Sequence, residues 1–124
     1  FEREVFVRKN TPNTQDVFVN RLQMRGRSNS HHFVVYGFRN TSSLLLPKVN
    51  EMRDLRFTNG TLNFTTLSEM QNHIFFGGGT DVNTDVTLPD GVALQFPPNT
   101  ALDLNAHYFN RSSYLLKGEN YEVR

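Results

Sequence analysis

The sequence predicts an all-β protein, an antiparallel β-sandwich of jelly-roll type. Short runs rich in Val, Phe, Tyr and Thr recur along the 124 residues, and clusters of Gly, Pro, Asn and Ser separate them. Helical periodicity is weak along the chain. Many short strands at this spacing are typical of sandwiches and jelly rolls. No linker or repeat indicates a second domain, so residues 1–124 are expected to form a single domain.

Turn residues divide the first half of the chain into three expected strands. Residues 4–8 form the first, and residues 16–24 are β-rich at their start. The apolar run 33–38 should be a central buried strand. Residues 44–54 are the only plausible helix, because Pro47 suits a first helical turn. That segment is short, and a loop is the alternative.

The second half should contain further strands joined by tight turns. The dipeptide Asn59-Gly60 favours a hairpin between the two runs that flank it. The glycines 77–79 lack the strand-to-helix context of a phosphate-binding loop and should form a turn that ends the preceding strand. In chain order the β-rich segments are 55–58, 61–65, 70–76, 87–96 with its Pro-Asp-Gly turn, 102–109 and 118–124.

Alternation of side chains across a strand divides residues 102–109 into two faces. One face is apolar and should pack on the core, and the other is more polar and carries His107. His107 should therefore be available to a ligand. Positions expected in the core are Phe33, Val35, Leu94, Phe96, Leu102 and Leu104.

Composition argues against several classes of function. Thirteen basic and 12 acidic side chains give a net charge of +1 without a basic stripe, which argues against nucleic acid as a partner. No apolar stretch is long enough to span a bilayer, so no membrane span is expected. The absence of cysteine rules out a disulfide, a thiolate-held cluster and a thiol nucleophile.

The histidines carry the strongest functional signal. Imidazole is the commonest protein ligand for zinc and copper, and three protein ligands with an open fourth position are typical of catalytic metal sites. Adjacent residues on a regular strand diverge, so His31 and His32 reach one ion only if a bulge turns one of them. The polar stretch 25–30 favours such an irregular start, and His107 would be the third ligand. The alternative is that these histidines are ordinary polar residues, and His73 is expected to be structural.

Three features occur in a fixed order along residues 15–124: His31-His32 before an apolar strand, Leu88-Pro-Asp-Gly-Val-Ala93, and Leu104-Asn-Ala-His107-Tyr108. This order resembles the first domain of the copper type II, ascorbate-dependent monooxygenases, such as peptidylglycine α-hydroxylating monooxygenase and dopamine β-monooxygenase. The resemblance implies an antiparallel jelly roll in which His31, His32 and His107 bind the copper that supplies electrons.

The resemblance also implies two partners. One is a reductant, ascorbate or another. The second is a following domain in the full-length protein, which would hold the other copper with two His and a Met. This chain does not supply that site, because its three methionines, Met24, Met52 and Met70, are accompanied only by His73. Animal members have disulfides in this domain, so a cysteine-free chain suggests a bacterial relative.

Three functions follow from these observations. The first is the copper domain of a two-domain monooxygenase, the second is a stand-alone copper-binding module, and the third is a jelly-roll domain that binds carbohydrate or protein. Zinc would also fit three histidines, and only the resemblance favours copper.

Because the chain begins in strand-like sequence, any export signal is expected to have been cleaved or left out. Sequons at Asn40, Asn59, Asn63 and Asn110 are compatible with the expected secreted or periplasmic location.

Overall fold

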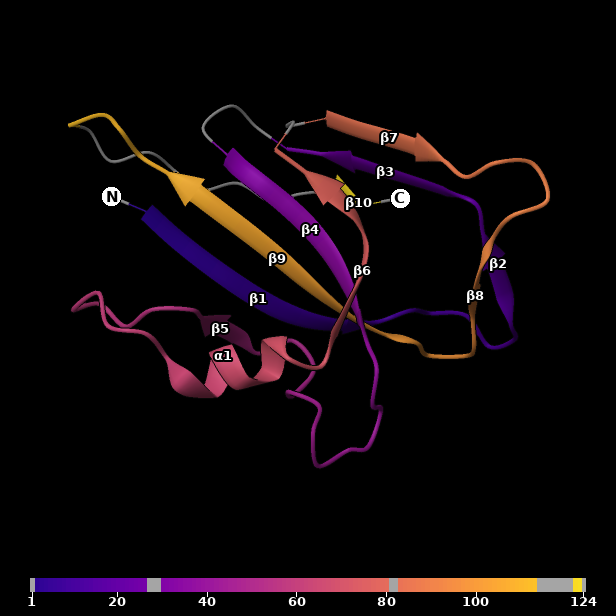
Figure 1. The fold of residues 1–124 in the computed structure, drawn as a ribbon, viewed down its shortest axis with the longest axis horizontal. Helices are drawn as coiled ribbons and strands as arrows, with labels where there is room; N and C mark the ends of the chain where they lie inside the picture. Colours follow the sequence, from indigo (N-terminus) through magenta and orange to yellow (C-terminus); the bar gives the residue numbers. More distant parts are fainter. Residues whose placement is uncertain (1, 27–29, 81–82, 114–121, 124) are drawn as a thin grey trace.

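The structure, a computed structural model, describes residues 2–26, 30–80, 83–113 and 122–123 (Figure 1). Strands dominate these residues, and every paired strand is antiparallel to its neighbour. The predicted class, an all-β sandwich of antiparallel sheets, is confirmed. The jelly-roll connectivity stays a prediction. Among the described residues, no helix is long and apolar enough to cross a bilayer.

A five-stranded sheet forms the centre of the fold and carries all four histidines. Its strand order is β5-β1-β9-β4-β6, so β9 lies between β1 and β4 (Figure 1). The strands are β5 (Met52–Asp54), β1 (Glu2–Asn10), β9 (Ala101–Phe109), β4 (Ser30–Phe38) and β6 (His73–Gly79). Histidines on β4, β6 and β9 therefore come from strands that lie next to one another.

Two smaller sheets complete the sandwich. The first has the order β10-β3-β7, and the second pairs β2 with β8. Their bounds are β10 (Glu122–Val123), β3 (Arg21–Arg25), β7 (Asn83–Thr87), β2 (Val17–Val19) and β8 (Leu94–Phe96). In Figure 1, β3 and β7 lie on one side of the five-stranded sheet, and the helix α1 (Phe64–Met70) lies on the other.

The apolar core lies between the five-stranded sheet and β3. Its buried members are Val5, Met24, Phe33, Val35 and Ala106, with Leu22, Phe76, Leu102, Leu104 and Tyr108 packed against them. The predicted apolar face of β9 is therefore confirmed. Of the six expected core positions, Phe33, Val35 and Phe96 are buried. Leu94, Leu102 and Leu104 are only partly buried.

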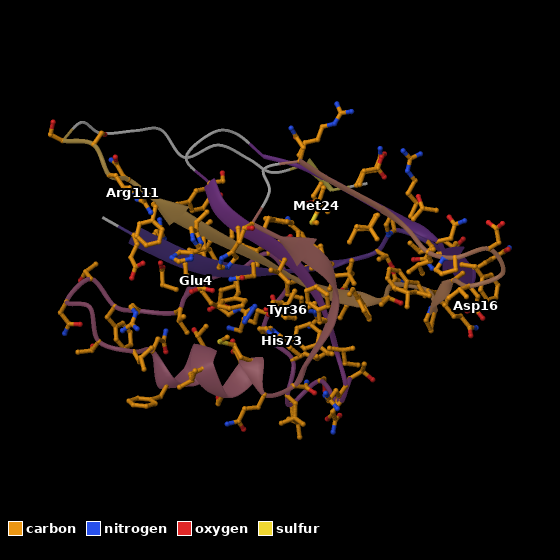
Figure 2. All side chains as sticks on the ribbon, turned by 45° about the horizontal axis from the view of Figure 1, so that its top comes forward. Glu4, Asp16, Met24, Tyr36, His73 and Arg111 are labelled. Atoms are coloured by element: carbon orange, nitrogen blue, oxygen red, sulfur yellow. The ribbon has the colours of Figure 1, made fainter. Side chains whose placement is uncertain are left out.

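The opposite face of the sheet is also buried, beneath α1, and there polar side chains lie among apolar ones such as Phe6 and Phe38. Asp103 is fully buried, and it accepts hydrogen bonds from the Arg53 guanidinium and from His73 Nε2 at 2.8 Å. Arg53 also pairs with Glu69 of α1. Figure 2 shows His73 beside Tyr36 between the sheet and the helix, and their rings are stacked 4.3 Å apart. His73 thus belongs to a buried ion network, in line with the structural role expected for it.

The expected helix at residues 44–54 is wrong, and the helix lies later, at Phe64–Met70. Asn63 begins it as the N-cap, because its side chain accepts hydrogen bonds from the backbone of Thr65 and Thr66. Arg53, by contrast, lies in β5, where it pairs with Phe6 of β1. Its buried ion pairs draw it into the sheet. Of the hairpin predicted around Asn59-Gly60, only the turn at Gly60 and an isolated bridge between Arg56 and Leu62 form. The helix begins within its second arm.

The glycines 77–79 do not end the strand as predicted; they extend β6 to Gly79. Gly78 has a φ of 131°, and a Cβ atom there would lie 2.3 Å from the carbonyl oxygen of Phe33. A Cβ on Gly77 would lie 2.3 Å from Leu22. Gly77 and Gly78 are glycines because β3 and β4 approach the strand too closely there for a side chain.

Candidate metal centre

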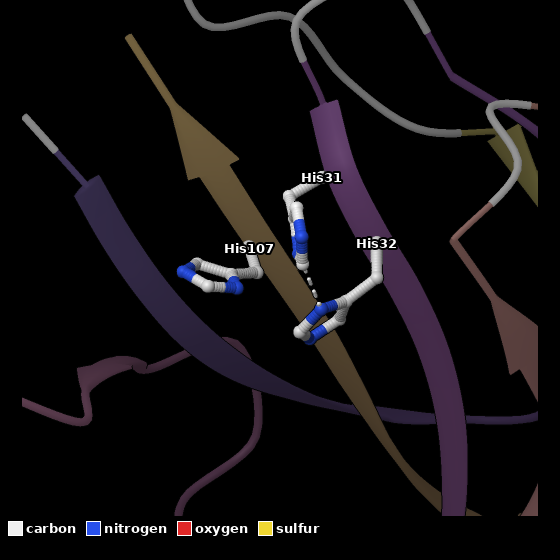
Figure 3. A group of neighbouring side chains, drawn as sticks. All are labelled: His31, His32 and His107. Atoms are coloured by element: carbon white, nitrogen blue, oxygen red, sulfur yellow. Dashed lines mark hydrogen bonds between the residues drawn. The ribbon is translucent and has the colours of Figure 1, made fainter. Parts of the chain in front are cut away.

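His31, His32 and His107 converge at one end of the five-stranded sheet (Figure 3). One ring nitrogen from each lies within 4.8 Å of those of the other two. The ring centroids are 5.4 Å apart for His31 and His32, 4.9 Å for His31 and His107, and 4.8 Å for His32 and His107. Among the described residues, His73 is outside this group.

A β-bulge at the start of β4 makes the convergence possible. Ser30 pairs with Tyr108 and His32 pairs with His107, so β4 has one residue more than β9 at this point. His31 is that extra residue. On a regular strand its side chain would point away from that of His32, and the bulge turns it to the same side. The irregular start predicted for this strand is confirmed.

Hydrogen bonds fix the orientation of the His32 ring. His32 Nε2 lies 3.1 Å from Asn105 Oδ1. The amide nitrogen of Asn105 is occupied by donation to Glu4 and to the Val5 carbonyl, both at 3.2 Å. Asn105 Oδ1 can only accept, so His32 Nε2 carries the proton, and in the neutral ring Nδ1 has the lone pair. This arrangement is typical of a metal-binding histidine, which donates its other N–H to a protein acceptor.

The Nδ1 atoms of His31 and His32 lie 3.2 Å apart. Two nitrogens bound tetrahedrally to one ion at 2.0–2.1 Å are about 3.3 Å apart. The pair therefore already has the separation of two ligands of one metal. In the same geometry every pair of ligand nitrogens is about 3.3 Å apart, so closing a gap of up to 4.8 Å needs a shift of up to about 1.5 Å.

His107 supplies the third nitrogen from β9. Its Nε2 lies 3.3 Å from a carboxylate oxygen of Glu2, and Figure 3 shows the opposite side of the ring turned towards His31 and His32. Among the described residues, His107 Nδ1 is buried and has no hydrogen-bond partner. Buried polar atoms normally have partners. A metal ion at the centre of the three rings would satisfy this nitrogen, so the residues present fit a metal.

Glu4 shapes the electrostatics of the centre. Its contact with His32 lowers the pKa of the Glu4 carboxyl, against the opposing effect of burial. The same contact raises the pKa of His32, with Asn105 adding to the effect. Both shifts come from the attraction between a carboxylate and an imidazolium ion. In the metal-free protein this pair favours a protonated His32, so protons compete with a metal for the ring.

The centre is open to small molecules on two sides. His31 is exposed, and the ring of Phe109 lies 5.2 Å from His31 and 5.1 Å from His107. A groove of about 1240 Å³ runs from His107 between β1, β5 and α1. Among its lining residues are Glu4, Glu51 and Phe57. A small molecule can thus reach His31 from solvent and His107 from the groove.

The acidic and amide partners of the histidines were missed by sequence reasoning. Glu2, Glu4 and Asn105 carry no motif of their own, although strand alternation places Asn105 on the face of His107. Glu2 and Glu4 reach the site because β1 pairs with β9, with Glu4 opposite His107. That pairing is not readable from either strand alone.

Comparison of the chain with protein-family models, with curated proteins and with solved structures gives no significant match.

Proposed function

We propose that His31, His32 and His107 hold one copper ion, and that the domain is the electron-supplying half of a protein resembling the copper type II, ascorbate-dependent monooxygenases. The observation that carries the metal site is the convergence of three imidazole nitrogens, one of which is buried without a partner among the described residues. The choice of copper rests on the resemblance of the His31-His32 and Leu104–Tyr108 segments to that family.

A copper ion at this position would change between its singly and doubly charged states and so carry one electron at a time. Residues next to the histidines orient the proposed ligands for this change of charge state. Asn105 and Glu4 keep the proton of His32 on Nε2, and Glu2 does the same for His107. The bulge at His31 brings the third ring into place. Three neutral imidazoles tolerate both charge states of copper without a thiolate.

The proposed reductant is ascorbate or a similar small molecule, which would approach by the exposed side of His31. The proposed electron acceptor is a second copper site on a further domain of the full-length protein. Residues for that second site are missing from this chain, where His73 is committed to the buried pair with Asp103. A secreted or periplasmic location is part of the same proposal.

A stand-alone metal-binding module is the second candidate. It is favoured by one observation: the three histidines and the groups that hold them all come from β1, β4 and β9 of this domain. This domain alone therefore supplies all three proposed ligands. Zinc, which accepts three histidines and a water molecule, would serve such a module as well as copper.

The test is to load the purified chain with one equivalent of copper or zinc and record X-ray absorption at the metal edge. We expect three imidazole nitrogens, at about 2.0–2.1 Å for zinc. Addition of ascorbate to the copper-loaded chain should remove the Cu(II) electron paramagnetic resonance signal. A metal bound mainly by oxygen would contradict the site. A three-nitrogen site that ascorbate does not reduce would favour the stand-alone module.

A further inference from the structure

Glu2 and Glu4 lie two residues apart on β1, and each carboxylate contacts a different histidine of the centre. Glu4 Oε1 is 3.5 Å from His32 Nε2, and Glu2 Oε2 is 3.3 Å from His107 Nε2. Residues i and i+2 of a strand share one face, so both acids point to the side of the sheet that carries the histidines. Two of the three rings are thus backed by a negative charge.

The two carboxylates differ in burial. The Glu4 side chain is 22% exposed and is also held by Asn105 Nδ2 at 3.2 Å, whereas the Glu2 side chain is 48% exposed. A charge with less water around it is screened less, so its field at the centre is stronger. Glu4 should therefore act on a bound ion more strongly than Glu2.

We propose that Glu4, assisted by Glu2, makes the centre select doubly charged over singly charged metal ions. This inference rests on the proposed metal site, but it does not require the metal to be copper. Coulomb energy is proportional to the charge of the ion, so a dication gains twice what a monocation gains from the same carboxylate. With copper in the site, the two acids stabilise Cu(II) relative to Cu(I) and make the bound Cu(I) a better electron donor.

The test compares Glu4→Gln with the matched control Glu51→Gln in the full chain. Glutamine keeps the shape of glutamate and an acceptor oxygen, so the change removes mainly the charge. Glu51 is exposed and lines the same groove. Its variant changes the net charge by the same amount, because it also replaces a glutamate by a glutamine. Affinities for Zn²⁺ and for Cu⁺ are measured by competition with chelators of known strength.

We expect Glu4→Gln to weaken Zn²⁺ binding about tenfold, the lower end for losing an outer partner of a ligand. Cu⁺ binding should weaken only about threefold, because half the Coulomb energy corresponds to the square root of the factor. The threefold difference corresponds to a rise of about 30 mV in the copper reduction potential. Glu2→Gln should produce smaller losses in the same ratio, and Glu51→Gln should change neither affinity.

Two results would overturn the inference. One is an equal loss for Zn²⁺ and Cu⁺, which would mean that Glu4 only positions His32. The other is a Glu4→Gln variant that behaves like Glu51→Gln. Melting curves of the metal-free variants show whether each one folds, and Glu2→Gln keeps the test decisive if Glu4→Gln does not. A wild-type chain that binds neither ion would instead overturn the proposed metal site itself.

Discussion

His32 and His107 stand directly opposite each other on the β4 and β9 strands, with their ring centroids 4.8 Å apart. They are a cross-strand pair, and such pairs project from the same face of a sheet. The sheet alone therefore builds two thirds of the centre. The third ring, His31, joins them only because β4 has one extra residue at this point.

Replacement of His107 by alanine should abolish tight metal binding. The change removes one of the three proposed ligands and leaves His31 and His32, which are neighbours in sequence and offer two nitrogens. The loss should exceed about 100-fold, the upper end for losing only an outer partner of a ligand. Calorimetric titration with Zn²⁺ measures the change, and unchanged affinity would show that His107 is not a ligand.

His73→Gln is the control for that experiment. Its ring pairs with Asp103 and stacks on Tyr36, away from the three converging rings. The variant should melt at a lower temperature, because it loses the buried ring that stacks on Tyr36 and packs beside Phe6 and Phe38. It should nevertheless bind Zn²⁺ with the affinity of the wild type. A large loss of affinity in a folded His73→Gln protein would move the metal site to a different part of the sheet.

Metal affinity should fall as the pH is lowered, and the fall should begin above pH 6.5. His32 binds metal only in its neutral form, and Glu4 raises the pKa of that ring above the ordinary value of 6.5. Protons therefore displace the metal at a higher pH than they would from an isolated imidazole. In Glu4→Gln the His32 pKa moves back towards 6.5, so the onset should shift to lower pH. Zn²⁺ titrations between pH 5.5 and 8.5 measure both curves, and identical onsets would contradict the assigned cause.

Sequence patterns predicted the strands better than the contacts between distant segments. The period-two alternation of β9 correctly separated Leu104 and Ala106 from His107, because alternation is a local property of a strand. The predicted position of the helix was wrong, because that position is decided by distant partners. Arg53 is drawn into β5 by Asp103, which lies 50 residues away in the chain, and Glu69 completes the same network from α1. No window of neighbouring residues contains that information.

The same distinction applies to the candidate site. Two adjacent histidines after a polar stretch were enough to predict the bulge, because both signals lie within a few residues. The partners Glu2 and Glu4 could not be predicted, since they depend on the register of β1 against β9. The burial of Asn105 had the same origin: strand alternation gave its face, and only the packing of the fold made that face an interior one.

Replacement of Phe96 by alanine should destabilise the protein by about 3–5 kcal/mol, the usual cost of removing a buried phenylalanine ring. Phe96 is buried at the end of β8, where its ring lies 5.3 Å from that of Phe76. Phe18→Ala is a matched control on the paired strand, because Phe18 is 70% exposed. Denaturant unfolding measures both variants. Equal stabilities for the two would mean that β8 does not pack on the core.

Replacement of Gly78 by alanine should lower stability and disturb the candidate metal centre. Its φ of 131° disfavours any side chain, and a Cβ atom would lie 2.3 Å from the Phe33 carbonyl oxygen and 2.7 Å from the Cα of Val34. Both contacts are with backbone, so β4 has to shift. Because Phe33 follows His32 directly, that shift should also carry His32 away from His107.

Gly79→Ala is the matched control, since a Cβ there meets no atom within 4 Å. We expect Gly78→Ala to lower both the melting temperature and the Zn²⁺ affinity, and Gly79→Ala to change neither. Gly78→Ala with wild-type stability and affinity would show that β6 does not approach β4 as closely as the structure places it.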